Sequence, residues 1–160
     1  MTPSPPWQLE GRALVLWEGG VRLRGLVNYL SSPVGPYLES ALVGFGPGGP
    51  TVVEMTVTAA QSREAGREFW GFPKELADLA WNQNRRHVEF READRHWRFW
   101  LQGPSLPFRV TGWTKQRRAG QTVVVPVRAA GRVALAFNGR RWALWLDPLR
   151  LSVFPARSSS

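Results

Sequence analysis

Hydrophobic and polar residues alternate along most of this chain. Residues 21–29 alternate with period two, which is typical of a strand with one buried face. Residues 37–45 are predicted to form a second strand. Residues 51–57, which are rich in β-branched side chains, are predicted to form a third, and the Gly/Pro segment 46–50 separates the two. With the apolar run 13–17, the first third of the sequence therefore predicts a series of short strands.

The strand pattern returns in the second half of the chain. Trp97 and Phe99 alternate with Arg98 and Trp100, which again indicates one buried face. Turns are predicted about residues 93–94 and at Asn138-Gly139, a pair that favours tight hairpins. Further strands are expected at 87–92, 95–101, 108–113, 122–128, 131–137 and 142–146.

Residues 59–70 form the clearest helix candidate, with Thr58 or Ser62 at its start. Gly66 lowers the helix propensity of this segment. Pro73 disfavours helical geometry at the residue before it, yet it suits the first turn of a second short helix, which would run through Ala80. The predicted fold is mainly β: a closed or strongly curved, mostly antiparallel, barrel-like sheet with one or two short helices near residues 59–80.

Length and composition narrow the class of protein. A chain of 160 residues predicts a single domain over 1–160, with 1–6 and 157–160 frayed. The sequence has no cysteine and two histidines, so we expect no disulfide, no metal and no cofactor. There is no apolar run of about 20 residues and no basic-then-apolar leader. We therefore expect a cytoplasmic protein that does not enter a membrane.

The formal net charge of +9 favours anionic partners. Arginine and aromatic residues interleave over 85–100 and at 115–118, a combination that single-strand nucleic-acid binders use. A GC-rich coding bias and strands with one buried face explain these features more simply, so a nucleic-acid partner is not expected. The many tryptophan and phenylalanine side chains suit a core or a homo-oligomer interface.

Lysine is scarce. Of 21 basic residues, only Lys74 and Lys115 are lysine, and the others are arginine. Arginine keeps its proton and does not act as an amine nucleophile. Lys74 follows Pro73 and the aromatic stretch 69–72, and burial in apolar surroundings favours a neutral, nucleophilic amine.

Two segments together resemble the acetoacetate decarboxylase family. Residues 32–39, Ser-Pro-Val-Gly-Pro-Tyr-Leu-Glu, are similar to the family's Gly-x-Tyr-x-Glu turn and strand. Residues 66–77, Gly-Arg-Glu-Phe-Trp-Gly-Phe-Pro-Lys-Glu-Leu-Ala, are similar to its Gly-Arg-Glu … aromatic-Pro-Lys-Lys-Leu/Met segment. The resemblance implies a barrel-like β fold and a lysine that forms a Schiff base with a keto acid. By position that lysine is Lys74, and the glutamate near the imine is Glu39.

The resemblance also predicts the surroundings of the site, with three departures. Glu75 stands where the family has a second lysine, which removes the cationic neighbour of the nucleophile. Arg12 is a provisional match for an active-site arginine, and counting back from Glu39 for an earlier glutamate leads to Arg24. The expected catalytic residues are Lys74 and Glu39, and the expected pocket residues are Tyr37, Trp70, Phe72, Glu75 and Arg12.

The expected function is Schiff-base chemistry on a small anionic keto acid, of the decarboxylation or aldol/dehydration type, with little acetoacetate decarboxylation. One alternative is a non-catalytic small-molecule binder on the same fold, and another is a basic nucleic-acid-binding module. If the two residues have no role in a site, Lys74 is expected to be a surface lysine paired with Asp78, and Glu39 to be an exposed strand residue. These alternatives differ in whether the Lys74 amine lies inside an apolar cavity with Glu39 facing it.

Overall fold

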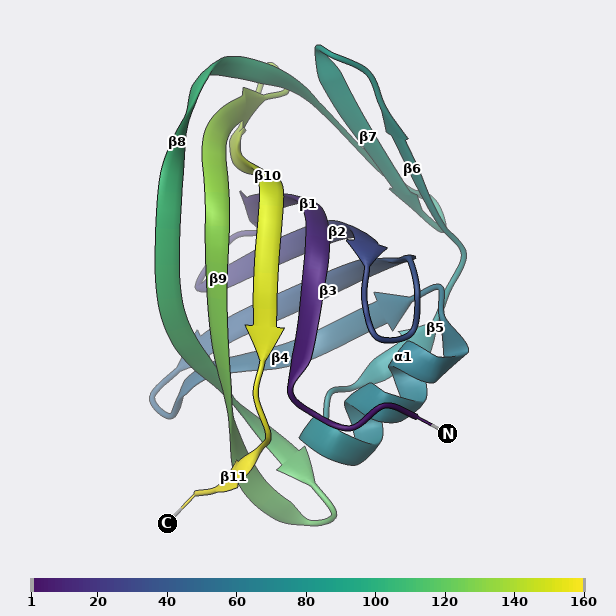
Figure 1. The fold of residues 1–160 in the computed structure, drawn as a ribbon. Coiled ribbons are helices and arrows are strands. Elements are labelled where there is room, and N and C mark those ends of the chain that lie inside the picture. The colour runs from purple at the N-terminus through teal and green to yellow at the C-terminus, as the bar shows by residue number, and fades with distance from the viewer. Residues whose placement is uncertain (1, 160) are drawn as a thin grey trace.

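The structure is a computed structural model that describes residues 2–159. Its strands form one eleven-stranded sheet in the order β5-β4-β3-β2-β1-β10-β9-β8-β7-β6, with β11 paired to β9 (Figure 1). All pairings are antiparallel except that of β4 with β5. The strands are β1 (Trp7–Trp17), β2 (Arg22–Ser31), β3 (Tyr37–Gly46), β4 (Gly49–Val57), β5 (Lys74–Leu76), β6 (Leu79–Gln83), β7 (His87–Glu92), β8 (Arg95–Arg118), β9 (Gln121–Phe137), β10 (Trp142–Val153) and β11 (Arg157–Ser158).

The sheet is strongly curved, but backbone pairing within residues 2–159 does not close it. Of the two predicted alternatives, a closed or a strongly curved sheet, the closed form is therefore not supported, whereas the mostly antiparallel, β-rich class is confirmed. Across the gap between β4 and β8, the Gln116 side chain accepts a hydrogen bond from the Val52 N–H at 2.8 Å and donates one to its carbonyl at 3.2 Å. A side-chain amide thus stands where a closed barrel would have a backbone ladder.

Two predicted pairs of strands are each one long strand. Residues 95–101 and 108–113 belong to β8, and residues 122–128 and 131–137 belong to β9. The register of β8 against β9 shifts between Gln102 and Leu106, around Gly103-Pro104. A bulge bends a strand without ending it, so the residues left between the two predicted strands form a bend in one continuous strand. The predicted hairpin of 87–92 with 95–101 is present as β7 and the start of β8.

The predicted helix 59–70 is present, in two parts. α1 (Ala60–Ala65) runs into η1 (Gly66–Trp70), a π-helical turn that ends at Gly71 with φ 72°. The predicted second helix through Ala80 is wrong, because Lys74–Leu76 pairs with β4 as the parallel strand β5. Pairing to an open sheet edge outweighs the local helix-start signal of Pro73.

Alternating side chains build two hydrophobic clusters. The first contains Trp7, Leu9 and Ala13 of β1 together with Trp70 and Phe72, near the helical segment. The second contains Leu14 and Leu16 of β1 and lies beneath the β6–β7 hairpin and the start of β8 (Figure 1). Leu14 and Leu16 have the opposite strand parity to Trp7, Leu9 and Ala13, so the two faces of β1 serve the two clusters.

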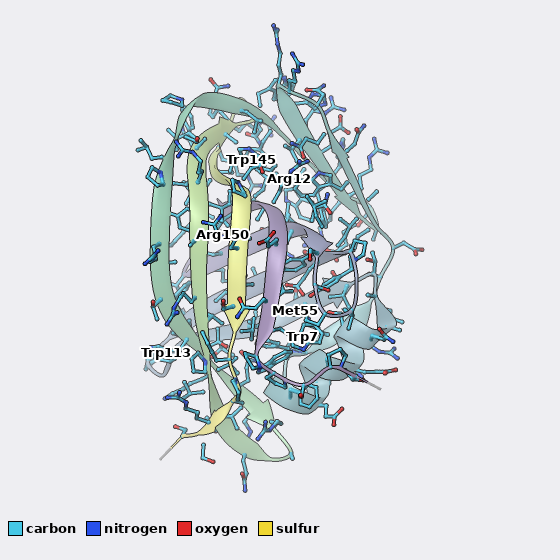
Figure 2. All side chains as sticks on the ribbon, in the orientation of Figure 1. Trp7, Arg12, Met55, Trp113, Trp145 and Arg150 are labelled. Atoms are coloured by element: carbon cyan, nitrogen blue, oxygen red, sulfur yellow. The ribbon has the colours of Figure 1, made fainter. Side chains whose placement is uncertain are left out.

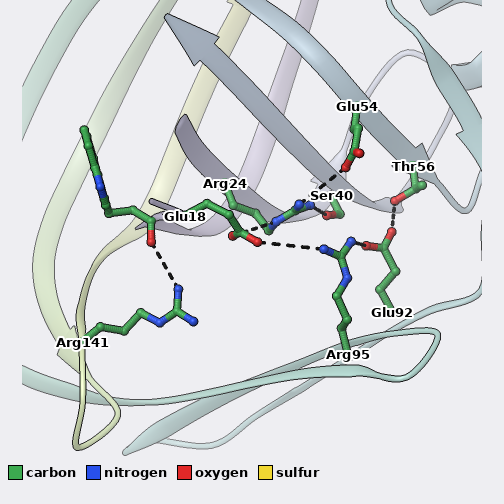
Figure 3. Close-up of polar contacts among 9 residues, drawn as sticks. Glu18, Arg24, Ser40, Glu54, Thr56, Glu92, Arg95 and Arg141 are labelled. Carbon is green, nitrogen blue, oxygen red and sulfur yellow. Dashed lines mark hydrogen bonds and ion pairs between the residues drawn. The ribbon is translucent and has the colours of Figure 1, made fainter. Parts of the chain in front are cut away.

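A polar network lies on the side of the second cluster (Figure 3). Arg24 is 2% exposed, and it donates to Glu18 at 3.0 Å and to the Ser40 hydroxyl at 2.9 Å. Arg95 pairs with Glu92 at 2.7 Å. Buried charges need partners of this kind, so Arg24 serves a structural network here.

The last strand, β11, pairs with the sheet near the C-terminal end of the described residues. Arg157 and Ser158 pair with Val124 and Val123 of β9. The predicted fraying of 1–6 and 157–160 includes Met1 and Ser160, which lie outside the described residues. None of the helices in residues 2–159 is long and apolar enough to cross a membrane.

Candidate active site

Lys74 is the first residue of β5, and its side chain points inward. Lys74 is 4% exposed, whereas Glu75 and Leu76 are exposed. Successive side chains of a strand point to opposite faces, so Glu75 points away from the Lys74 amine. It forms an ion pair with Arg67, and the prediction that Glu75 lines the pocket is corrected to this surface position.

The Gly-Arg pair at the start of η1 positions Lys74. A Cβ atom at Gly66 would stand 2.5 Å from Cδ and 2.7 Å from Cε of Lys74, so the lysine stem crosses the helix where a side chain is missing. Arg67 Nε donates to the Lys74 carbonyl at 2.7 Å. These two contacts give a structural reason for the Gly-Arg sequence ahead of the lysine.

Replacing Gly66 with alanine will displace the Lys74 side chain. Alanine is favoured over glycine by about 1 kcal/mol in an unobstructed helix, whereas the clash here will lower the free energy of unfolding by roughly 1–3 kcal/mol. Urea denaturation measures the change. Gly25→Ala is the control, because a Cβ at Gly25 meets nothing within 4 Å. A Gly66→Ala protein as stable as the parent would contradict the close approach.

The Lys74 amine contacts two polar side chains, Glu39 and Ser62, from two different elements. Nζ stands 3.1 Å from Glu39 Oε2 of β3 and donates to Ser62 Oγ of α1 at 2.9 Å. The other oxygen of Glu39, Oε1, accepts from the Tyr29 hydroxyl of β2 at 3.4 Å. Nζ also lies 5.6 Å from the Tyr37 ring centroid, a cation–π distance. Lys74 and Glu39 are therefore a buried, hydrogen-bonded ion pair.

The two tyrosines beside Glu39 keep their protons at neutral pH. Burial raises the pKa of the Tyr29 hydroxyl well above its usual value, and the Glu39 charge raises it further. Burial and Glu39 likewise raise the pKa of Tyr37, which Ser62 lowers in part. Each phenol therefore stays a neutral hydrogen-bond donor near the carboxylate.

A cavity of about 150 Å³ opens beside the ion pair. Trp70 closes one wall, where its indole N–H donates to the Phe154 carbonyl at 2.8 Å and its ring meets Trp7 edge-on at 5.3 Å. Trp7 and Met55 are labelled in this region in Figure 2. Of the predicted site residues, the cavity brings together Tyr37, Glu39, Trp70, Phe72 and Lys74.

Arg12 does not belong to this group. Its Nε lies 3.4 Å from Asp147 and its guanidinium donates to Gln83 of β6 at 3.1 Å; Figure 2 shows it near Trp145, away from Met55. In β1, Trp7 and Leu9 face the cavity, and an even-numbered neighbour projects to the opposite side. The prediction that Arg12 lines the pocket is therefore corrected: its side chain lies on the opposite face of β1 from Trp7 and Leu9.

Three site residues were not predicted as such from the sequence. Ser62 lies four residues before Gly66, on the same face of the helix, a spacing that was available as a signal. Tyr29 pairs with Tyr37 across β2 and β3, which the hairpin pattern also implied. Thr114 lines the cavity from β8, and nothing local in the sequence indicated it. No group of three or more histidine, aspartate or glutamate side chains in residues 2–159 is arranged to hold a metal ion.

The fold is similar to those of two solved acetoacetate decarboxylase structures. The crystal structure of the enzyme from Legionella pneumophila subsp. pneumophila str. Philadelphia 1 has a TM-score of 0.67 and 12% identity, over 99% of this chain and 88% of that one. A structure from structural studies of acetoacetate decarboxylase has a TM-score of 0.61 and 9% identity, over 99% and 91%. No family model and no curated protein matches the sequence. The chain has an acetoacetate decarboxylase-like fold, and its chemistry must be argued from its own residues.

Proposed function

We propose that Lys74 forms a Schiff base with the carbonyl carbon of a small molecule bound in the adjoining cavity. The observation that carries this proposal is the buried amine beside the cavity, 3.1 Å from a carboxylate. A lysine amine beside a proton acceptor in apolar surroundings has the parts that imine chemistry needs. The similar fold of acetoacetate decarboxylases supports the proposal.

Glu39 acts as the proton acceptor and donor. An ammonium does not attack a carbonyl, so the proton must leave Nζ first. Glu39 Oε2 stands 3.1 Å from Nζ, within reach to take that proton. The amine then adds to the carbonyl carbon, Glu39 returns the proton to the departing oxygen, and water leaves.

The protonated imine draws electrons from the neighbouring carbon. It therefore stabilises the carbanion that remains when a keto acid loses carbon dioxide, or the one needed for aldol addition and dehydration. Glu75 is exposed, so the position of the family's second lysine does not contribute a charge to the amine. Desolvation and proton transfer to Glu39 replace that charge in this mechanism.

A second candidate is a non-catalytic binder that uses the same cavity. The observation that favours it is that Nζ already has two protein partners: it donates to Ser62 Oγ and pairs with the Glu39 carboxylate. Such contacts hold the amine as ammonium. In this case Lys74 and Glu39 are a structural pair, and the ligand binds beside them without reacting.

Borohydride trapping separates the two candidates. The protein is incubated separately with 2-keto acids, 3-keto acids, ketones and aldehydes, and each mixture is reduced with borohydride. The mass of the intact protein is then measured by mass spectrometry. We expect one adduct per chain with at least one compound. If the protein is a non-catalytic binder, its unfolding temperature will instead rise with ligand concentration, as mass action requires, and its mass will not increase. Stabilisation without any adduct across the panel would reject the Schiff-base proposal.

A further inference from the structure

The cavity lining has no charge left for an anionic ligand. Among residues 2–159, Lys74 is the only cation in the lining and Glu39 the only anion, and they pair at 3.1 Å. The remaining walls are apolar or aromatic, except for the neutral hydroxyls of Tyr29, Tyr37 and Thr114. An ionised carboxylate that enters such a cavity loses its hydration and gains no opposite charge.

The charge balance of imine formation leads to the same conclusion. The overall step is R–NH3⁺ plus O=C, giving R–NH⁺=C plus water, so the single positive charge is kept and Glu39 continues to neutralise it. A neutral ketone or aldehyde leaves the site neutral throughout. A keto acid adds one negative charge that no described cavity residue offsets.

Thr114 provides a further binding group. Its Oγ1 is buried without a hydrogen-bond partner, and the residue lines the cavity from β8. The other such atom among the described residues, Arg12 Nε, lies 3.4 Å from the Asp147 carboxylate. An unpaired buried hydroxyl is costly, and a ligand oxygen in the cavity would satisfy it.

We propose that the ligand of this site is a neutral ketone or aldehyde with one additional uncharged oxygen, which Thr114 binds. This inference rests on the proposed imine chemistry for its reaction but on the cavity lining for its ligand class. A cavity of about 150 Å³ accommodates a molecule of roughly benzene size. The net positive charge of the chain lies outside the lining and does not select the ligand.

Three methyl ketones of equal heavy-atom number test the ligand class: 4-hydroxypentan-2-one, 4-methylpentan-2-one and acetoacetate. They carry, in turn, an uncharged oxygen, an apolar group and a carboxylate at the same place. We expect borohydride adducts to form fastest with 4-hydroxypentan-2-one. Adducts with acetoacetate should form more slowly by a factor of roughly ten or greater. Adducts that have lost carbon dioxide are counted with acetoacetate.

Thr114→Val tests the second contact. It should lower the trapping rate of 4-hydroxypentan-2-one relative to that of 4-methylpentan-2-one by roughly fivefold. Thr111→Val is the matched control, because Thr111 is an exposed threonine on the same strand. A threonine that only supports the fold would instead lower trapping of both ketones alike, which would overturn its assignment.

Thermal stabilisation by each unreduced ketone separates this inference from the proposed function. Faster trapping of acetoacetate would overturn the neutral ligand class and leave the imine chemistry standing. Absence of all adducts, with stronger stabilisation by the neutral ketones, would reject the imine chemistry and support the ligand class. Neither adducts nor stabilisation with any of the three would overturn both.

Discussion

Replacing Lys74 with arginine will abolish borohydride-trapped adducts entirely. Arginine keeps a positive charge beside Glu39, but a guanidinium does not act as an amine nucleophile. Intact-mass spectrometry after reduction measures the loss, and circular dichroism checks that the variant is folded. Because burial and the contacts to Ser62 and Glu39 are specific to Lys74, the effect should be complete.

Lys115→Arg is the matched control, because Lys115 is the only other lysine of the chain. This variant should keep the full adduct, and peptide mapping should locate the added mass on the segment that contains Lys74. An adduct that survives in Lys74→Arg and maps to Lys115 or to the chain's terminal amine would contradict the assignment of the nucleophile.

Lys74→Met will destabilise the fold strongly, because it leaves the Glu39 carboxylate buried without its cation. Removal of one partner of a buried ion pair costs about 3–5 kcal/mol, whereas replacement of both by apolar residues is often neutral. The Lys74→Met/Glu39→Leu protein should therefore lie within about 1.5 kcal/mol of the parent. Chemical denaturation of the parent, both single variants and the double variant measures the coupling.

The exposed pair of Arg67 and Glu75 is the control for that experiment. Their side chains are 48% and 68% exposed, and exposed ion pairs contribute about 1 kcal/mol or less. Glu75→Gln should therefore lower stability only slightly. If the double variant at Lys74 and Glu39 proves as unstable as the single variants, the cost arises from lost packing or lost hydroxyl contacts, and the uncompensated-charge explanation is incorrect.

Local patterns predicted much of the fold. Period-two alternation located β2 and the start of β8 because one face of each strand is buried. The β-branched stretch after the Gly/Pro segment 46–50 located β4. The helical segment was found within about one residue at each end. The prediction divided β8 into two strands and placed a helix start at Pro73. Cross-strand pairing instead continues the first strand and creates the strand β5 after Pro73.

The two motif segments located part of the site, and strand parity decided the rest. Tyr37 and Glu39 share a face of β3 because they are two residues apart, and both line the cavity with Lys74. The predictions that Arg12 and Glu75 line the pocket were not met, because each side chain points to the face of its strand opposite the cavity. Whether a residue of an irregular or newly paired segment faces inward depends on its register, which bulges and the parallel pairing of β5 determine.

The sequence by itself determined which chemistry was available: two lysines, no cysteine, and a Gly-Arg segment eight residues before Lys74. Those are properties of residue type and local spacing. Only the tertiary structure decided that Ser62 contacts Nζ, that Tyr29 contacts Glu39, and that Thr114 joins them from β8. These contacts join residues far apart in the chain, and they depend on how far the sheet curves and how its strands are paired.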